Sequence, residues 1–188
     1  LGETVIDRPV GRIEKVGENA WAVIAKMDGG RELVSNGGII AGRDAVLVVE
    51  AHMTTDGAAF VRAAARELTG RDVTHVVLTH YHGDHTAGLA GHLADGCQLI
   101  STATTSTSLY DAYRDSRQPG KNEHLRGGPP CVLPDTLLHS EEEVTEIDLG
   151  SRVVRLRPTG GHTASDVVIE VDDRRLVPVA VAERRRTG

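Results

Sequence analysis

The chain contains several short runs rich in valine, isoleucine and alanine, separated by turn-forming residues. Two of these runs, 20–27 and 45–51, are typical of strands because β-branched side chains favour an extended backbone. Between them, segment 35–44 carries Asn-Gly-Gly and a further glycine, a composition that predicts a turn. A third run, Val-Thr-His-Val-Val-Leu-Thr-His at 73–80, predicts a buried strand.

Helical spacing of apolar residues predicts three helices. The first covers 57–70, with Thr55 or Asp56 as its N-cap and a glycine at its end. The other two are expected over 86–94 and 103–117, on either side of a short strand.

The second half of the chain has a different pattern. Segment 118–130 is rich in glycine and proline and predicts a loop, which we interpret as a mobile flap beside the site. After it, apolar positions typical of half-buried strands are Val153, Leu156, Val167, Ile169 and Val171. The order strand–helix–strand–helix, followed by antiparallel strands, predicts an α+β fold of mixed sheets covered by helices. One domain is expected over 1–188.

Composition and charge narrow the function. The net charge of −6 and the aromatic content of 3% give neither an attractive field nor stacking platforms for nucleic acid. No apolar run approaches the roughly 20 residues that cross a bilayer, so we expect no membrane partner and a cytoplasmic location. Cys97 and Cys131 are expected to be free thiols. The chain begins at Leu1 rather than methionine, which leaves its natural start open.

One short turn concentrates metal-binding side chains. His80, His82, Asp84 and His85 fall within six positions directly after a predicted strand. Side chains alternate along an extended backbone, so His80 and His82 point the same way and can bind one ion together. Asp84 and His85 follow a glycine and suit a second divalent ion, Zn²⁺ best of all.

Three stretches of sequence resemble one family. Residues 80–85 read His-x-His-x-Asp-His, residues 36–51 are similar to an opening hairpin, and 160–171 carry Gly-His-Thr followed by aspartate. Together they resemble the metallo-β-lactamase-fold superfamily, in particular the hydrolases that include glyoxalase II-like thioesterases, lactonases and cyclase-like enzymes. The resemblance implies a sandwich of two mixed sheets flanked by helices (αββα).

The resemblance also implies roles for individual residues. His80, His82 and His162 would bind the first zinc, and Asp84 and His85 the second. A metal-held hydroxide would attack the carbonyl of a small-molecule substrate, with Asp84 as the catalytic residue that orients the hydroxide or receives its proton.

Two further carboxylates have expected roles near these ligands. Glu50 stands where the family has aspartate, and it either fixes a metal-binding imidazole or is an ordinary strand-end charge. Asp166 is expected to brace the Gly-His-Thr turn by accepting backbone hydrogen bonds. His52, His75, His92, His124 and His139 are expected to be structural or solvated, with His52 of slightly more interest because it follows a strand that ends near the site.

The C-terminal stretch departs from the family pattern. No histidine follows His162 and no aspartate follows Asp173, so the family's bridging aspartate and late histidine lack counterparts. Glu183 is the one remaining carboxylate near the expected place. We therefore expect one well-held zinc, a second position partly occupied or empty, and an incomplete second half whose tail, 177–188, leaves the family pattern. Truncation and a short one-metal form both fit, and an uncovered apolar face on the last hairpin would favour a homodimer.

Three functions remain open on the sequence. The first is a zinc-dependent hydrolase of an ester, thioester or lactone-like carbonyl. The second is a catalytically impaired metal-binding fragment or pseudoenzyme. The third is a di-iron oxidoreductase, which uses a similar ligand set.

Overall fold

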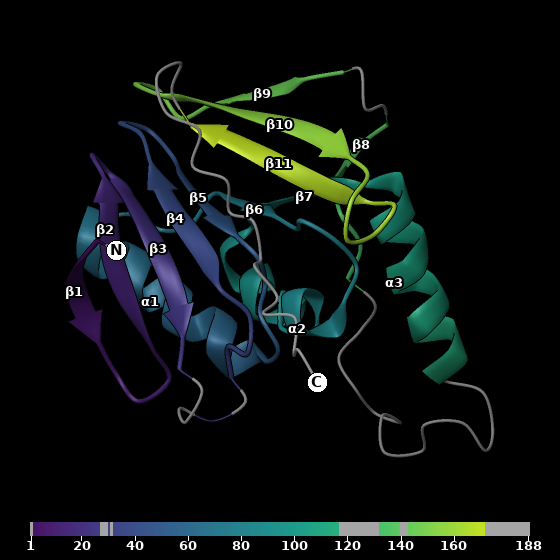
Figure 1. The fold of residues 1–188 in the computed structure, drawn as a ribbon, viewed down its shortest axis with the longest axis horizontal. Coiled ribbons are helices and arrows are strands. Elements are labelled where there is room, and N and C mark those ends of the chain that lie inside the picture. The colour runs from purple at the N-terminus through teal and green to yellow at the C-terminus, as the bar shows by residue number, and fades with distance from the viewer. Residues whose placement is uncertain (1, 27–29, 31, 117–131, 140–142, 172–188) are drawn as a thin grey trace, which may run out of the picture.

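A large sheet and a small sheet pack face to face, with helices on the far side of the large one (Figure 1). This computed structural model describes residues 2–26, 30, 32–116, 132–139 and 143–171. The whole of the predicted flap, 118–130, and the whole of the tail, 177–188, lie outside this range. Within the described part, no helix has the length and apolar character needed to cross a membrane.

The large sheet has eight strands that follow one another in chain order. Pairing is antiparallel from β1 to β5 and parallel from β5 to β8. Its strands are β1 (Glu3–Asp7), β2 (Gly11–Gly17), β3 (Ala20–Ala25), β4 (Gly37–Ala41), β5 (Val46–Val49), β6 (His75–Val77), β7 (Gln98–Thr102) and β8 (Thr136–Leu138). The predicted mixed sheet is thus confirmed, and two N-terminal strands join it that the sequence had not indicated.

The small sheet consists of three antiparallel strands in the order β11-β10-β9. They are β9 (Thr145–Asp148), β10 (Val153–Thr159) and β11 (Asp166–Val171). Leu156, Val167 and Ile169 face the large sheet as predicted, whereas Val153 lies on the outer face and Val154 takes the inward position. The prediction at this position was wrong because Val153 is an odd number of residues from Leu156, and side chains two apart share a face.

Strand β5 shows why the core has two parts. Val46 and Val48 pack toward helix α1 (Thr55–Thr69), and Leu47 and Val49 pack toward the small sheet. A strand covered on both faces reads as an unbroken apolar run. Burying one such side chain contributes about 1.5–3 kcal/mol, so this run fixes the stacking of the layers.

The segment between the first two predicted strands is a strand rather than a turn. β4 pairs with both β3 and β5, and the β4–β5 hairpin that the resemblance implied is present. Its glycines allow close approach of other chain segments: a Cβ on Gly37 would lie 2.5 Å from the carbonyl oxygen of Val49 and 2.9 Å from the ring of His52. The composition was misleading because glycine serves here for contact instead of for turning.

The helices differ from prediction in two places. The N-cap of α1 is Thr54, whose hydroxyl accepts from the amide of Gly57 over 3.1 Å, one residue before the predicted caps. The expected helix over 86–94 is divided into a single turn, α2 (Gly83–Thr86), and a 3₁₀ helix, η1 (Leu89–Asp95). The break lies at Gly88, where a Cβ would come within 2.3 Å of the backbone oxygens of Ala51 and Thr54, in the segment between β5 and α1. Helix α3 (Ala103–Ser116) matches its prediction.

The described layers run helix, large sheet, small sheet, which confirms the predicted α+β fold and agrees with the two-sheet sandwich that the resemblance implied. In Figure 1 no described helix lies over the outer face of the small sheet. That face is not apolar as expected, because it carries the ion pairs Arg155–Glu146 at 2.8 Å and Arg157–Glu170 at 3.8 Å. A homodimer remains a proposal, and an exposed apolar face of this hairpin no longer supports it.

Candidate metal centre

The histidine turn lies where parallel strands end at one edge of the large sheet. Glu50 follows β5 and His80 follows β6, and parallel neighbours release both segments on the same side. The amide of Val167 in β11 donates to the carbonyl of Thr79 over 3.0 Å. This bond ties the small sheet to the turn and brings the β10–β11 loop, with His162, against it.

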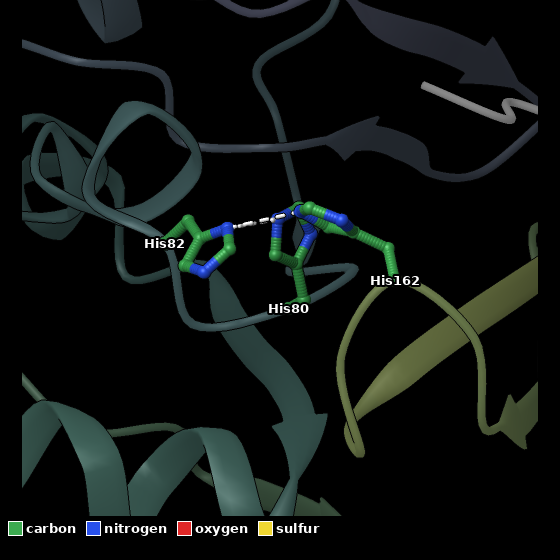
Figure 2. Close-up of side chains that lie close together, drawn as sticks. All are labelled: His80, His82 and His162. Atoms are coloured by element: carbon green, nitrogen blue, oxygen red, sulfur yellow. Dashed lines mark hydrogen bonds between the residues drawn. The ribbon is translucent and has the colours of Figure 1, made fainter. Parts of the chain in front are cut away.

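Three imidazoles converge at this edge (Figure 2). His80 Nε2 lies 3.2 Å from His82 Nδ1, and His162 Nε2 lies 3.1 Å from the same atom. The three rings meet edge to face, with centroids 4.8 to 5.0 Å apart. His80 is buried, His82 is half-buried and His162 is exposed, so the cluster opens to solvent on the side of the small sheet.

A metal explains this convergence better than hydrogen bonding does. His82 Nδ1 carries either one N–H or one lone pair in the plane of the ring. It therefore cannot make a good hydrogen bond to both neighbouring nitrogens at once. A tetrahedral zinc with Zn–N bonds of 2.0–2.1 Å separates its nitrogen ligands by roughly 3.3 Å. The observed separations are close to this value, so the residues fit a divalent metal.

Glu50 orients His80 through Thr79. The Thr79 hydroxyl donates to Glu50 Oε1, and the Thr79 amide donates to Oε2 over 3.3 Å. Because the Thr79 hydroxyl proton is directed at Glu50, the Thr79 hydroxyl oxygen accepts a hydrogen bond from Nδ1 of His80, 2.9 Å away. His80 therefore carries its proton on Nδ1, which leaves the Nε2 lone pair facing the other two imidazoles.

Glu50 also contacts the second pair of predicted ligands. His85 Nδ1 lies 3.0 Å from Glu50 Oε1, and His85 Nε2 lies 3.3 Å from Asp84 Oδ2. With Nδ1 against the carboxylate, Nε2 and Asp84 Oδ2 are the two atoms free to share an ion. Of the two predicted roles for Glu50, the structure thus supports the orienting one, and a single buried carboxylate serves both parts of the site.

The pKa values of His80 and His85 are shifted in opposite directions. Burial lowers the pKa of His80 to about 4, helped by His85 and His82, so its ring is neutral at pH 7. Burial also lowers the pKa of His85, but the Glu50 carboxylate and the nearby Asp84 outweigh it and leave the pKa raised. The raised pKa favours the protonated ring, so a metal that binds Nε2 competes with protons for this nitrogen.

Asp166 braces the loop that carries His162, as predicted. Its Oδ2 accepts from the amide of His162 over 2.6 Å, and its Oδ1 accepts from the hydroxyl of Thr163 over 2.7 Å. Burial raises the pKa of Asp166, but these hydrogen bonds outweigh it and hold the pKa below its usual value. The loop is therefore fixed by an ionised aspartate, and His162 is held in place from its backbone.

The remaining histidines lie outside the converging groups. His75 contacts the hydroxyl of Thr74 over 2.8 Å, and His92 is buried in η1 away from the ligands. His52 is fully buried, and its Nδ1 lies within hydrogen-bonding distance of the Ser35 carbonyl oxygen. His139 is exposed and does not lie with the converging ligand atoms, and His124 lies outside the described residues.

Two residues with polar contacts at the site were not singled out from the sequence for this purpose. Neither Thr79 nor Ser35 had an expected role in positioning the ligands. Both are hydroxyl residues whose partners are 29 and 49 positions away in the chain, so no local pattern marks them.

Comparison with known proteins agrees with this geometry. A family model described as the metallo-beta-lactamase superfamily matches residues 30–179. Metallo-beta-lactamase domain-containing protein 1 from Xenopus laevis is 32% identical over 111 residues, which is 59% of this chain. The match spans 36% of that relative's length.

Solved structures show the same fold. The crystal structure of the DIM-1 metallo-beta-lactamase superposes with a TM-score of 0.64 at 23% identity, covering 87% of this chain and 65% of that one. A metallo-beta-lactamase from Pontibacter korlensis gives a TM-score of 0.62 at 17% identity, covering 91% of this chain and 78% of the other. At these identities the likeness concerns the fold alone.

Proposed function

The chain belongs to the metallo-β-lactamase superfamily, and from this premise we propose that it is a metal-dependent hydrolase of an ester, thioester or lactone-like bond. The observation that carries the proposal is the meeting of three imidazole nitrogens, 3.1 and 3.2 Å apart, at a face open to solvent. Catalytic metal sites keep one position open for water or substrate, whereas structural sites are closed by a fourth protein ligand.

Zinc is the proposed metal because neutral imidazoles suit it and its preferred geometry matches the nitrogen separations. When bound, zinc supplies Lewis acidity, which polarises a carbonyl and makes water more acidic. His80, His82 and His162 would hold it at the first position. Asp84 and His85 offer two ligands at the second position, which is fewer than tight binding needs.

Asp84 is the proposed catalytic residue. Its side chain is 39% exposed, so the carboxylate can reach both the second position and an incoming small molecule. An ionised carboxylate at the open side of the site can orient water and accept its proton as the water attacks the substrate carbonyl. Glu50 is fully buried and cannot take this role, so the two carboxylates divide the work of positioning and proton transfer.

Hydrolysis by metal-stripped and reloaded protein tests the proposal. Protein dialysed against a chelator is compared with protein reloaded with Zn²⁺ or, under anaerobic conditions, Fe²⁺, on an aryl ester, a thioester, a γ-lactone and a cephalosporin. Turnover that returns with Zn²⁺ and is absent in His162→Ala supports the hydrolase. Folded protein that retains zinc but turns over none of the four would instead indicate the metal-binding module.

A further inference from the structure

Ser35 and His52 lie outside the ligand set, but they contact the turn that carries it. The hydroxyl of Ser35 donates to the backbone carbonyl of Asp84 over 2.6 Å. Ser35 is 5% exposed and His52 is fully buried, so this contact is shielded from water on the donor side and is part-buried as a whole. A shielded hydrogen bond holds its partners in place more firmly than an exposed one.

The carbonyl of Asp84 needs such a partner because α2 is only one turn long. In a continuing helix it would accept from the amide of Gly88, but that amide donates to the carbonyl of His52 over 2.9 Å. The next carbonyl, that of His85, accepts from the amide of Ala51 over 2.9 Å. Ser35 and the chain after β5 therefore take over the carbonyl hydrogen bonds that the helix does not make.

His52 fixes Ser35 in turn. Its Nδ1 lies 3.2 Å from the Ser35 carbonyl oxygen, which can only accept, so Nδ1 carries the proton. The same nitrogen is 3.4 Å from the Ser35 hydroxyl oxygen, and this leaves the hydroxyl proton directed at Asp84. The result is a chain of contacts from His52 through Ser35 to the backbone of Asp84.

The backbone around these contacts is strained. Among the described residues other than glycine, four have positive φ, and Val34, Glu50 and His52 are three of them, with φ of 62°, 76° and 61°. The amide of Ser35 also donates to the carbonyl of Leu33 over 2.7 Å, closing a tight three-residue turn at Val34. Positive φ is a genuine outlier for a β-branched residue, and such strain persists only where surrounding contacts impose it.

We propose that Ser35 and His52 are positioning residues that hold Asp84 at the second metal position. The effect of this positioning on catalysis rests on the proposed function, because Asp84 is the proposed catalytic residue. The positioning itself is tested by metal binding alone. Fixing the Asp84 carbonyl fixes the start of α2, and with it the direction in which the Asp84 carboxylate leaves the turn beside His85 Nε2.

Cobalt(II) titration of the metal-stripped full chain, followed by visible absorption, separates the two positions. Ser35→Ala removes the hydroxyl, and Ser35→Thr keeps it. His52→Leu removes the donor, whereas His52→Asn keeps an N–H near the Nδ1 position and tolerates positive φ. Thermal melts of the metal-free variants report folding separately.

We expect the first equivalent of cobalt to bind all variants as it binds wild type. The second equivalent should bind Ser35→Ala and His52→Leu about 10- to 100-fold more weakly, the usual effect of losing a partner that orients a ligand. Ser35→Thr or His52→Asn should restore it. The inference is overturned if wild type takes up one equivalent only, if Ser35→Ala binds the second like wild type, or if both equivalents weaken together. Normal cobalt binding without hydrolysis would refute the proposed function and leave this inference standing.

Discussion

Replacing Glu50 by glutamine removes one charge at the point where the two halves of the site meet. The wild-type carboxylate accepts from the hydroxyl and amide of Thr79 and lies 3.0 Å from His85 Nδ1. Oε1 faces both the Thr79 hydroxyl and His85 Nδ1, whereas Oε2 faces the Thr79 amide, so a glutamine must point its NH₂ at an N–H, either that of His85 or that of Thr79. Two donors meet in a place that is fully buried.

The size of the expected stability loss follows from the buried donor that is left without an acceptor. A buried polar group without its partner costs about 1–3 kcal/mol. In a domain of this size 1 kcal/mol lowers Tm by about 2–4 °C, so Glu50→Gln should melt about 2–12 °C below wild type. Where the NH₂ points at His85, the ring can relieve the clash by moving its proton to Nε2, which removes a metal ligand, and affinity at the second position should then fall about 10- to 100-fold.

Calorimetry of the metal-free protein and competition with a coloured chelator measure the two effects. Glu67→Gln is the matched control, since it makes the same chemical change on a side chain of α1 that is 58% exposed. It should change stability by no more than about 0.5 kcal/mol. If Glu50→Gln melts with wild type and binds both equivalents normally, Glu50 does not orient His85 and the proposed division of roles is wrong.

Three further variants test the ligand set, the bracing of its loop and the buried histidine of η1. His162→Ala should lose the first metal while His75→Ala keeps it, as elemental analysis after desalting would show; equal loss from both would contradict the ligand assignment. Asp166→Asn should weaken the first metal about tenfold by loosening the turn that carries His162, and unchanged chelator competition would speak against this bracing. Burial, with His52 and Arg62 nearby, lowers the pKa of His92 from 6.5 to about 3. Between these two pH values the unfolded chain binds a proton at His92 that the folded protein does not bind. The folded protein therefore loses stability as the pH falls through this range. In urea titrations of metal-free protein, His92→Leu should therefore gain stability over wild type at pH 5 relative to pH 8, and an equal difference at both pH values would refute the role of His92.

The ligands were predictable because they are local. Four of the five lie within six positions, and a short turn rarely gathers that many metal-binding side chains unless they bind a metal. His162 is different, since its place beside His82 depends on the hydrogen bond from Val167 to Thr79 between the two sheets. The family resemblance supplied it, and the hydrophobic pattern alone would not have.

The parts that were missed depend on packing between distant segments. Segment 35–44 looked like a turn because its glycines were read as local signals, although Gly37 lies where the backbone of Val49 and the ring of His52 approach closely. The helix after the histidine turn is interrupted at Gly88 for the same reason. Ser35 was missed because its partner, Asp84, is 49 residues away.

Anomalous diffraction at the zinc edge, from crystals grown with zinc, is the sharpest test of the assigned metal centre. We predict one strong peak bonded to His80 Nε2, His82 Nδ1 and His162 Nε2 at about 2.0–2.1 Å, with a weaker peak between Asp84 and His85. A strong peak held by Glu50 and His85 in place of the three imidazoles, or no peak in contact with His162, would contradict the assignment.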